Sequence, residues 1–191
     1  MGFLINKIRT FFWSGFYSIF GACFFTSKGR GCKFEGWIDI PQRGGNITLG
    51  DYVRICRFVE FSVPQGGFLS IGNNSFIGRG SLISAKESVV IGKEVLLAEN
   101  VCIHDNDHSF ACLSTPISKQ GFYSKPVIIE DDCWLGAKVV VLKGCHIRSK
   151  AIIGASSLVT RDIELNAVVF GVPAAPYFCR FEPRLKSNGE G

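Results

Sequence analysis

Large apolar residues recur at every sixth position along most of the chain. The longest unbroken series lies in the C-terminal half and consists of Ile129, Leu135, Val141, Ile147, Ile153 and Val159. Shorter series with the same spacing are Leu49, Ile55 and Phe61, then Ile71, Ile77 and Ile83, then Ile91, Leu97 and Ile103. A period of six fits neither an α-helix, with about 3.6 residues per turn, nor an alternating strand. It is typical of a repeat protein in which every unit adds one short strand.

Two other positions of the repeat are also restricted. The residue four places after the apolar one is small or β-branched, as in Ser75, Val95, Cys133, Cys145 and Ser157. The residue directly after the apolar one is often glycine, as in Gly72, Gly92 and Gly136. Small residues and glycine allow the tight corners of a coil built from three short flat strands. We therefore predict an all-β solenoid of about five coils, whose interior is filled by one apolar side chain per side.

The hexads divide the chain into three parts. Residues 34–172 carry the solenoid, and residues 1–33 and 173–191 are expected to be short helical appendages that cap its two ends. The six-residue spacing is lost over residues 104–128, which therefore form a loop that leaves the coil. A regular solenoid gains no stability from such a loop, so we expect the loop to be functional.

The N-terminal segment combines basic residues with a run of aromatic ones. Lys7 and Arg9 precede the apolar residues 11–25, FFWSGFYSIFGACFF. This run is shorter than the roughly 20 residues that cross a bilayer, and its interspersed Ser and Gly residues suit an interface. Two interpretations stay open. The segment is either an amphipathic helix on the inner membrane or a helix packed on the body or on a neighbouring subunit.

The composition excludes several classes of protein. With 191 residues, of which 47% are hydrophobic, the chain is long and apolar enough for a folded domain. Its net charge of +5 suits an anionic cofactor or a membrane surface, but the dense basic clusters of a nucleic-acid-binding protein are missing. No two of the eight cysteines form a CxxC pair. This favours free, reduced thiols in a cytoplasmic protein over a zinc cluster or a disulfide framework.

Several segments resemble one known family. The runs IGNNSFIGRGSLIS (71–84) and WLGAKVVVLKGCHIRSKAIIGASSLVTRDI (134–163), followed by GVPA (171–174), resemble the hexapeptide-repeat acyltransferases. The resemblance extends over about residues 34–180. It implies a left-handed parallel β-helix, usually assembled as a homotrimer, with acetyl-CoA bound in a groove between adjacent subunits.

Three motifs indicate a branch within that family. The segments IHDNDHSF (103–110), PISKQG (116–121) and KPVIIEDDCWLG (125–136) are similar to sugar O-acetyltransferases of bacterial surface polysaccharides, which are related to the galactoside and maltose acetyltransferases. The resemblance implies transfer of acetyl from acetyl-CoA to a sugar hydroxyl in O-antigen, capsule or exopolysaccharide biosynthesis. The acceptor is expected to be a lipid-linked sugar if the N-terminal segment lies on the membrane, and otherwise a free or nucleotide-linked sugar.

His108 is the candidate general base. Transfer of an acyl group to an alcohol needs a base that works near neutral pH, and a neutral imidazole matches that task. In the resembled family the catalytic histidine ends a short polar turn such as Asn106-Asp107-His108, which favours His108 over His104. His104 is expected to line the wall of the site, where it could contact the acceptor. His146 lies at a corner of the regular repeat and is expected to be exposed and without a catalytic role.

The residues around this histidine supply candidate acceptor contacts. Asp105 and Asp107 could orient the imidazole ring or bind sugar hydroxyls through charge-assisted hydrogen bonds. Formation of the turn itself is an equally open interpretation for both aspartates. Asn100 and Glu99, at the preceding corner, and Glu60 are further candidates for acceptor contacts.

The acetyl-CoA site is implied by the resemblance. The residues that match it are Trp134, Gly136, Ala137, Ala155, Thr160 and Arg161. Small residues let the pantetheine arm lie along the backbone, and Thr160 and Arg161 match its polar end. The indole N–H of Trp134, or a backbone N–H, is a candidate donor to the oxyanion. No metal is expected to be required.

One segment departs from the family pattern. The family often continues GVPA with a lysine and an arginine that contact the CoA phosphates, whereas residues 175–178 intervene in this chain. Cations return at Arg180, Arg184 and Lys186. Phosphate recognition is therefore expected to have moved to Arg180, unless CoA binds more weakly.

Three alternative functions are weighed against O-acetylation. A γ-type carbonic anhydrase needs three histidines around one zinc ion, but His146 lies in the regular repeat, far from the loop in sequence. An acetyltransferase acting on serine or on the amine of an amino sugar stays open. A non-catalytic β-helical scaffold would not explain the interrupting loop and its histidines.

Overall fold

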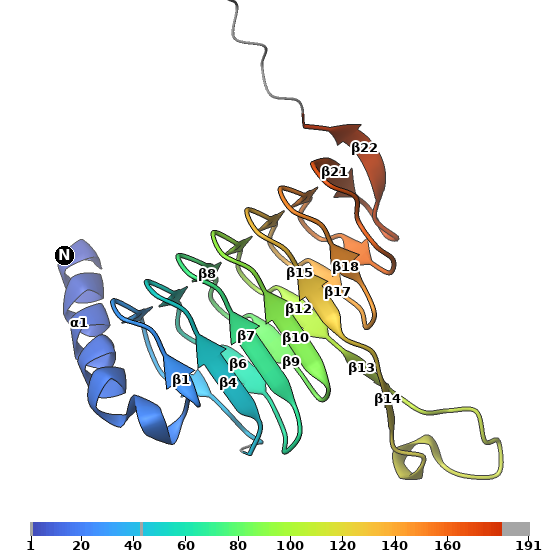
Figure 1. Ribbon diagram of the computed structural model, residues 1–191, viewed down its shortest axis with the longest axis horizontal. Coiled ribbons are helices and arrows are strands. Elements are labelled where there is room, and N and C mark those ends of the chain that lie inside the picture. The colour runs from blue at the N-terminus through green and yellow to red at the C-terminus, as the bar shows by residue number, and fades with distance from the viewer. Residues whose placement is uncertain (1, 43, 181–191) are drawn as a thin grey trace, which may run out of the picture.

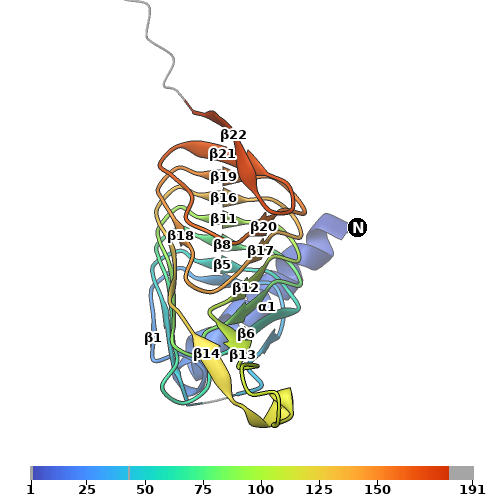
Figure 2. The same cartoon turned by 90° about the vertical axis from the view of Figure 1, so that its right-hand side faces the viewer.

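The chain forms a solenoid of three parallel sheets in the computed structural model, which describes residues 2–42 and 44–180 (Figures 1 and 2). The first sheet contains β1 (Ser27–Lys28), β4 (Asn46–Leu49), β7 (Phe68–Ile71), β10 (Ser88–Ile91), β15 (Val127–Ile129) and β18 (His146–Ile147). The second contains β2 (Lys33–Phe34), β5 (Arg54–Ile55), β8 (Phe76–Ile77), β11 (Leu96–Leu97), β16 (Trp134–Leu135), β19 (Ile152–Ile153), β21 (Ala167–Phe170) and β22 (Ala175–Cys179). The third contains β3 (Ile38–Asp39), β6 (Val59–Ser62), β9 (Leu82–Ser84), β12 (Cys102–His104), β17 (Val140–Val141) and β20 (Leu158–Val159).

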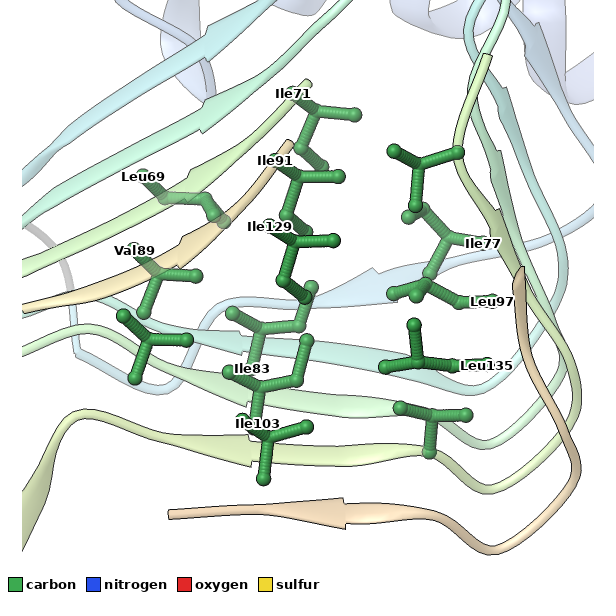
Figure 3. Packing of buried hydrophobic residues seen from close by; sticks show 14 of the residues in the cluster. Leu69, Ile71, Ile77, Ile83, Val89, Ile91, Leu97, Ile103, Ile129 and Leu135 are labelled. Atoms are coloured by element: carbon green, nitrogen blue, oxygen red, sulfur yellow. The ribbon is translucent and has the colours of Figure 1, made fainter. Parts of the chain in front are cut away.

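The hexad residues fill the interior of the solenoid, as predicted. Figure 3 shows them stacked in columns, one layer per coil. One column contains Ile71, Ile91 and Ile129, which are aligned in register in the first sheet. All residues labelled in Figure 3 are at most 1% exposed. Because burial of one such side chain contributes about 1.5–3 kcal/mol, these columns are the main source of stability.

The corners of the coil are built by left-handed residues and small hydroxyl or thiol side chains. Asn74, Glu94 and Asp132 occupy equivalent corners with φ of 59°, 57° and 58°. The buried Ser75 hydroxyl donates to the carbonyl of Gly92 at 2.8 Å and accepts the N–H of Val95 at 3.0 Å. Cys133 occupies the corner equivalent to that of Ser75 in a later coil. Its thiol contacts the carbonyl of Arg148 at 3.2 Å. All eight cysteines are free, and the thiols within the corners therefore serve as packing groups.

The solenoid has about six coils rather than five, because the first coil begins before residue 34. Its opening strand β1 already pairs with β4. Lys28 stands opposite Leu49 in this pair, so the hexad residue that would reveal the coil is replaced by a lysine. Phe34 and Ile40 keep the six-residue spacing in this coil, so only its opening strand lacks the apolar residue that a search for spacing would find.

Helix α1 (Gly2–Phe20) and the short 3-10 helix η1 (Gly21–Cys23) cover the N-terminal end of the solenoid (Figure 1). The hydroxyl of Tyr17 accepts the N–H of Ile38 at 2.9 Å, and the hydroxyl of Ser14 accepts the N–H of Phe34 at 3.0 Å. These bonds satisfy N–H groups that have no further coil to pair with. The helix predicted for the N-terminal segment is thus present and acts as a cap. No helix within the described residues is long and apolar enough to span a bilayer.

The C-terminal end is closed by a strand pair. β22 turns back and pairs antiparallel with β21. The expected helical appendage is therefore absent from residues 173–180, where the apolar residues instead extend the second sheet. Residues 181–191, including Arg184 and Lys186, lie outside the described residues.

The interruption in the hexads is a projecting arm, defined here as residues 105–126. Its stem is an antiparallel pair of β13 (Asn106–His108) and β14 (Phe122–Ser124), and the 3-10 helix η2 (Ile117–Lys119) lies near its tip. Figure 2 shows the arm leaving the solenoid at the edge of the third sheet. The coil resumes with β15, which pairs with β10 as if the arm were absent. The predicted loop of residues 104–128 thus agrees with the arm to within two residues at each end.

Candidate active site at the root of the arm

The arm is fixed to the coil below it by the carboxylate of Asp105. This side chain is fully buried and accepts three backbone N–H groups, from Lys86 at 2.9 Å, Glu87 at 2.7 Å and Ser88 at 2.8 Å. The predicted role of Asp105 in contacting the acceptor is therefore wrong, because the carboxylate is enclosed and its bonds are used by the backbone. The alternative interpretation, that Asp105 forms the turn, describes its position.

The next two residues of the arm are also held by the solenoid. The amide of Asn106 donates to the Ser84 hydroxyl at 2.9 Å and to Asp105 at 2.9 Å. Asp107 is half-buried and forms an ion pair with Lys143, which lies after β17. Asp107 thus has one oxygen engaged, while its partly exposed side chain still reaches solvent. These contacts set the direction in which β13 leaves the coil.

His108 lies at the end of β13 and is exposed. Its ring packs on Phe122 of β14, with the ring centroids 4.3 Å apart and the planes tilted by 36°. The ammonium of Lys86 lies 3.4 Å from the centroid of the same phenyl ring. Among the described residues, no group forms a hydrogen bond with the imidazole nitrogens of His108. The ring is therefore supported from one side while both nitrogens stay accessible to a substrate.

These side chains line one hollow, called here the arm-root hollow, of about 410 Å³. Its lining residues are Ser84, His104, Asn106, Asp107, His108, Phe122 and Leu142. His104 thus lines the wall of the hollow together with His108, as predicted. A hollow with an imidazole, a carboxylate and an amide over an apolar floor suits a small polar ligand and a proton transfer.

Asn100 does not belong to this hollow. It occupies the corner before β12 with φ of 56°, whereas His104 and the arm lie at the opposite end of that strand. The expected contact between Asn100 and an acceptor held at His108 is therefore not formed within one chain. Glu99 occupies the same corner, so the same holds for it.

Sequence reasoning missed four members of the site: Ser84, which comes from the preceding coil, and Phe122, Lys143 and Leu142. Phe122 reaches His108 through pairing of the arm strands, and Leu142 and Lys143 arrive from the next coil. The pairing has no strong signature, because the arm strands have no alternating pattern. Counting from Val141, which pairs with Ile103, would have placed Leu142 beside His104.

The residues expected to bind acetyl-CoA are distributed over the surface of a single chain. Trp134 is half-exposed on the second sheet, in register between Leu96 and Ile152. Gly136, Ala137 and Ala155 form the corner between the second and third sheets, and a Cβ atom on Gly136 would lie 2.7 Å from the backbone nitrogen of Ala155. This close approach explains glycine there.

The remaining expected CoA contacts occupy two other corners. Thr160 and Arg161 are exposed directly after β20, on the edge of the third sheet that also carries the arm. Arg180 donates to the carbonyl of Lys150 at 3.0 Å, at the corner between the first and second sheets. One chain therefore does not gather these residues around a common ligand.

His146 is less exposed than expected. Its side chain is half-buried, and Nε2 lies 2.7 Å from Glu130. Hydrogen bonds from Ser149, followed by the contact with His146, lower the pKa of the Glu130 carboxyl. This cluster lies on the first sheet, and no three His, Cys, Asp or Glu side chains of the described residues converge as metal ligands would.

The chain is similar to proteins that share its repeat. A family model described as bacterial transferase hexapeptide (six repeats) matches residues 126–161, and one described as hexapeptide repeat of succinyl-transferase matches residues 69–104. The putative lipopolysaccharide biosynthesis O-acetyl transferase WbbJ of Escherichia coli is 30% identical over 152 residues, which cover 76% of this chain and 78% of that protein. Repeat, arm and relatives together define a hexapeptide-repeat β-helix protein. The chain belongs to the hexapeptide-repeat sugar O-acetyltransferase family.

Two further relatives match over a smaller part of their length. The galactoside O-acetyltransferase of Escherichia coli is 36% identical over 127 residues, covering 66% of this chain and 60% of that protein. The probable acetyltransferase Rv3034c of Mycobacterium tuberculosis is 34% identical over 146 residues, covering 76% of this chain and 47% of that protein. The matched region thus spans about half the length of these relatives.

Solved structures share the architecture at low sequence identity. AntD, an N-acyltransferase from Bacillus cereus in complex with dTDP and 3-hydroxybutyryl-CoA, has a TM-score of 0.73 at 19% identity, covering 86% of this chain and 88% of that one. The hexapeptide-repeat acetyltransferase VCA0836 of Vibrio cholerae, complexed with acetyl-CoA, has a TM-score of 0.55 at 21% identity, covering 83% and 73%. At these identities the likeness shows the fold.

Proposed function

We propose that the protein transfers acetyl from acetyl-CoA to a sugar hydroxyl, with His108 as general base. The observation that carries this proposal is the exposed imidazole of His108, whose nitrogens are accessible in a hollow that the solenoid itself does not need. The relatives named for O-acetyl transfer to lipopolysaccharide and galactosides support a sugar acceptor. The acceptor is proposed to be an intermediate of a surface polysaccharide.

The neutral imidazole of His108 accepts the proton of the acceptor hydroxyl as its oxygen attacks the thioester carbonyl. The new carbon–oxygen bond forms and the carbonyl oxygen becomes an oxyanion. Collapse of this intermediate breaks the carbon–sulfur bond, and the imidazolium returns its proton to the departing CoA thiolate. Phe122 holds the ring from one side, and Asn106 and Asp107 direct the strand that presents it.

We propose a homotrimer as the active form. Trp134 and Leu96 are about half-exposed and lie with Phe76 in an apolar row on the second sheet. Exposed apolar surface of this kind is typical of subunit contacts. Trp134 and the small-residue corner are remote from His108 within one chain, so an oxyanion or CoA contact from them requires a neighbouring copy. Light scattering at micromolar concentration is expected to give three copies per particle.

Helix α1 is proposed to contact a membrane surface. Its outer side exposes Ile8, Phe11, Phe12 and Ile19, and Lys7 is exposed beside them. Deleting the helix would also remove the Tyr17 and Ser14 caps, so a substitution is the better test. Phe11→Ser with Phe12→Ser is expected to abolish flotation with vesicles containing anionic phospholipid, while Leu113→Ser leaves it unchanged. Flotation that persists in the double variant contradicts the contact.

The test of the function is release of free CoA thiol from acetyl-CoA over a panel of sugars, amino sugars and serine. An acceptor-dependent signal with a sugar lacking amines, lost in His108→Ala and kept in His146→Ala, supports O-acetylation. A signal confined to amino sugars would favour N-acetylation instead. A wild-type protein that neither binds CoA nor releases thiol with any acceptor contradicts the proposal.

A further inference from the structure

A second hollow, of about 540 Å³, lies where α1 meets the first two coils. We call it the helix-side hollow, and the residues that carry the argument are Trp13, Trp37, Asp39, Arg57, Phe58 and Glu60. It is separate from the arm-root hollow, since the two share no lining residue. Its volume lies within the range of small-ligand sites.

Phe58 occupies a position that is unfavourable for a phenylalanine. It has φ of 61° and is 71% exposed. The register of the third sheet places Gly80, Asn100, Lys138 and Ser156 at the same corner of later coils. A bulky residue in the left-handed region is strained, and exposure of its ring adds no burial to compensate. The corner itself imposes this φ, which Tyr52 shares, so the feature that bears on binding is the exposed phenyl ring of Phe58 beside the hollow.

The aromatic wall of the hollow is fixed before any ligand arrives. Trp37 packs against Trp13 with ring centroids 6.0 Å apart, and against Phe24 at 5.6 Å and 89°. Trp37 nevertheless keeps 46% of its surface exposed. The ring therefore offers a rigid face to solvent, which lowers the entropic cost of binding.

The polar groups of the hollow are available for hydrogen bonds. Asp39 and Glu60 face outward from the third sheet, and neither carboxylate forms a hydrogen bond or an ion pair within the described residues. The guanidinium of Arg57 lies 5.4 Å from the Phe58 ring centroid and has no ion-pair partner among those residues. Glu35 is engaged by Arg54 and Arg9.

This combination fits an uncharged sugar ring. Aromatic faces pack on the apolar side of the ring, carboxylates accept its hydroxyl protons, and a guanidinium donates to its oxygens. Glu35 is neutralised by its ion pairs, but the carboxylates of Asp39 and Glu60 are adjacent in register and repel a phosphate or a uronic acid placed against them. A sugar unit that packs beside these two carboxylates is therefore expected to be uncharged.

The helix-side hollow lies on the same sheet as the arm-root hollow. Glu60 pairs in register with Leu82, and Leu82 with Cys102, two residues before His104. Glu60 and Cys102 are therefore separated by two strand spacings, which amount to about 10 Å. The charge of Glu60, after burial, also raises the pKa of the Cys102 thiol. The third sheet thus connects the two hollows over the length of a short oligosaccharide.

We propose that the helix-side hollow binds an uncharged sugar unit of an oligosaccharide acceptor, while another unit of the same acceptor reaches His108. The inference depends on the proposed function in one respect only, which is the role of His108 as general base. It makes the acceptor an oligosaccharide laid along the third sheet.

The binding test uses a printed array of neutral, amino and uronic oligosaccharides of one to six units, probed with the His108→Ala protein so that no turnover occurs. We expect retention on neutral oligosaccharides and about tenfold weaker retention after Phe58→Ala or Glu60→Gln. Tyr52→Ala is the matched control, because Tyr52 is also a left-handed corner aromatic, with φ of 58° and 53% exposure, outside the hollow. Retention on no glycan, retention only on uronic acids, or equal loss in the control would overturn the proposal.

The kinetic test separates this inference from the proposed function. With a retained oligosaccharide as acceptor, Phe58→Ala is expected to raise its KM about tenfold and to leave kcat and the KM for acetyl-CoA unchanged. Array binding that depends on Phe58 without any acetyl transfer would uphold the hollow and contradict the function. Acetyl transfer with an unchanged KM for the oligosaccharide would uphold the function and contradict the role of the hollow. Light scattering must give the same particle mass for both proteins, since a change would identify the hollow as a subunit contact.

Discussion

The coils and the arm are stabilised in opposite ways. In the coils, apolar side chains such as Leu97 and Ile103 are completely buried, and each strand inside a sheet pairs with a neighbour on both sides. In the arm, Leu113 is completely exposed and two short strands pair only with each other. The arm keeps its place because Asp105, Asn106 and Asp107 bind the coil at its root. The region with the least packing of its own therefore carries the candidate chemistry.

The largest expected effect separates chemistry from stability. His108→Ala should lower the acetylation rate by about 10²–10⁴-fold, since it removes the general base. The midpoint of thermal unfolding should stay within about 2 °C, because an exposed arm side chain adds little to the core. Circular dichroism melts beside the thiol-release assay test both statements. A His108→Ala protein that unfolds at a clearly lower temperature, or one that keeps its acetylation rate, contradicts this separation of catalysis from stability.

The second prediction concerns the coils. Leu97→Ala should lower the free energy of unfolding by about 2–5 kcal/mol, because it opens a cavity in the apolar columns. Leu113→Ala makes the same chemical change in the arm and should alter it by less than about 0.5 kcal/mol. Urea unfolding measures both values. Equal losses would mean that the arm is packed in the assembled protein.

A smaller effect is expected at the root of the arm. Asp105→Asn keeps one accepting oxygen but loses the charge that three N–H groups share, at a cost of about 1–3 kcal/mol. Hydrogen exchange should quicken at Glu87 and Ser88, and the acetylation rate should fall while the apolar columns stay protected. Exchange that quickens throughout the coils would show that Asp105 supports the whole solenoid.

The smallest effect is a difference in thiol reactivity. Hydrogen bonds from Ser114 and Thr115 lower the pKa of Cys112 in the arm to about 7, while burial raises the pKa of Cys133 and Cys145 to about 11. Thiolates are the reactive form, so alkylation of Cys112 should rise steeply between about pH 6 and pH 8. Peptide-resolved mass spectrometry after iodoacetamide treatment measures the extent of alkylation at each cysteine. Ser114→Ala should slow the reaction at pH 7, and equal labelling of Cys133 would count against the comparison.

The fold was predictable because the hexads repeat the same information in each coil. The opening strand of the first coil escaped this prediction, since Lys28 stands where an apolar residue was needed. The C-terminal strand β22 also differed from the expected helix, because its pairing with β21 is a long-range choice that local composition does not encode.

The candidate site was predictable only in part. His108 and His104 follow from the motif and from the interrupted repeat. The burial of Asp105 depends on where the backbone N–H groups of residues 86–88 point, which no sequence pattern reveals. Phe122 reaches His108 through the pairing of two short strands in the arm, and their register was not visible either.

The insertion of the arm leaves the coil around it unchanged. Asp131 accepts the N–H of Lys93 from 38 residues away, and Asn73 makes the equivalent bond to Asp51 across 22 residues. The corner geometry is the same with or without the extra chain between the coils. The length and sequence of the arm can therefore change during evolution while the coil stays the same, and acceptor specificity can change with the arm.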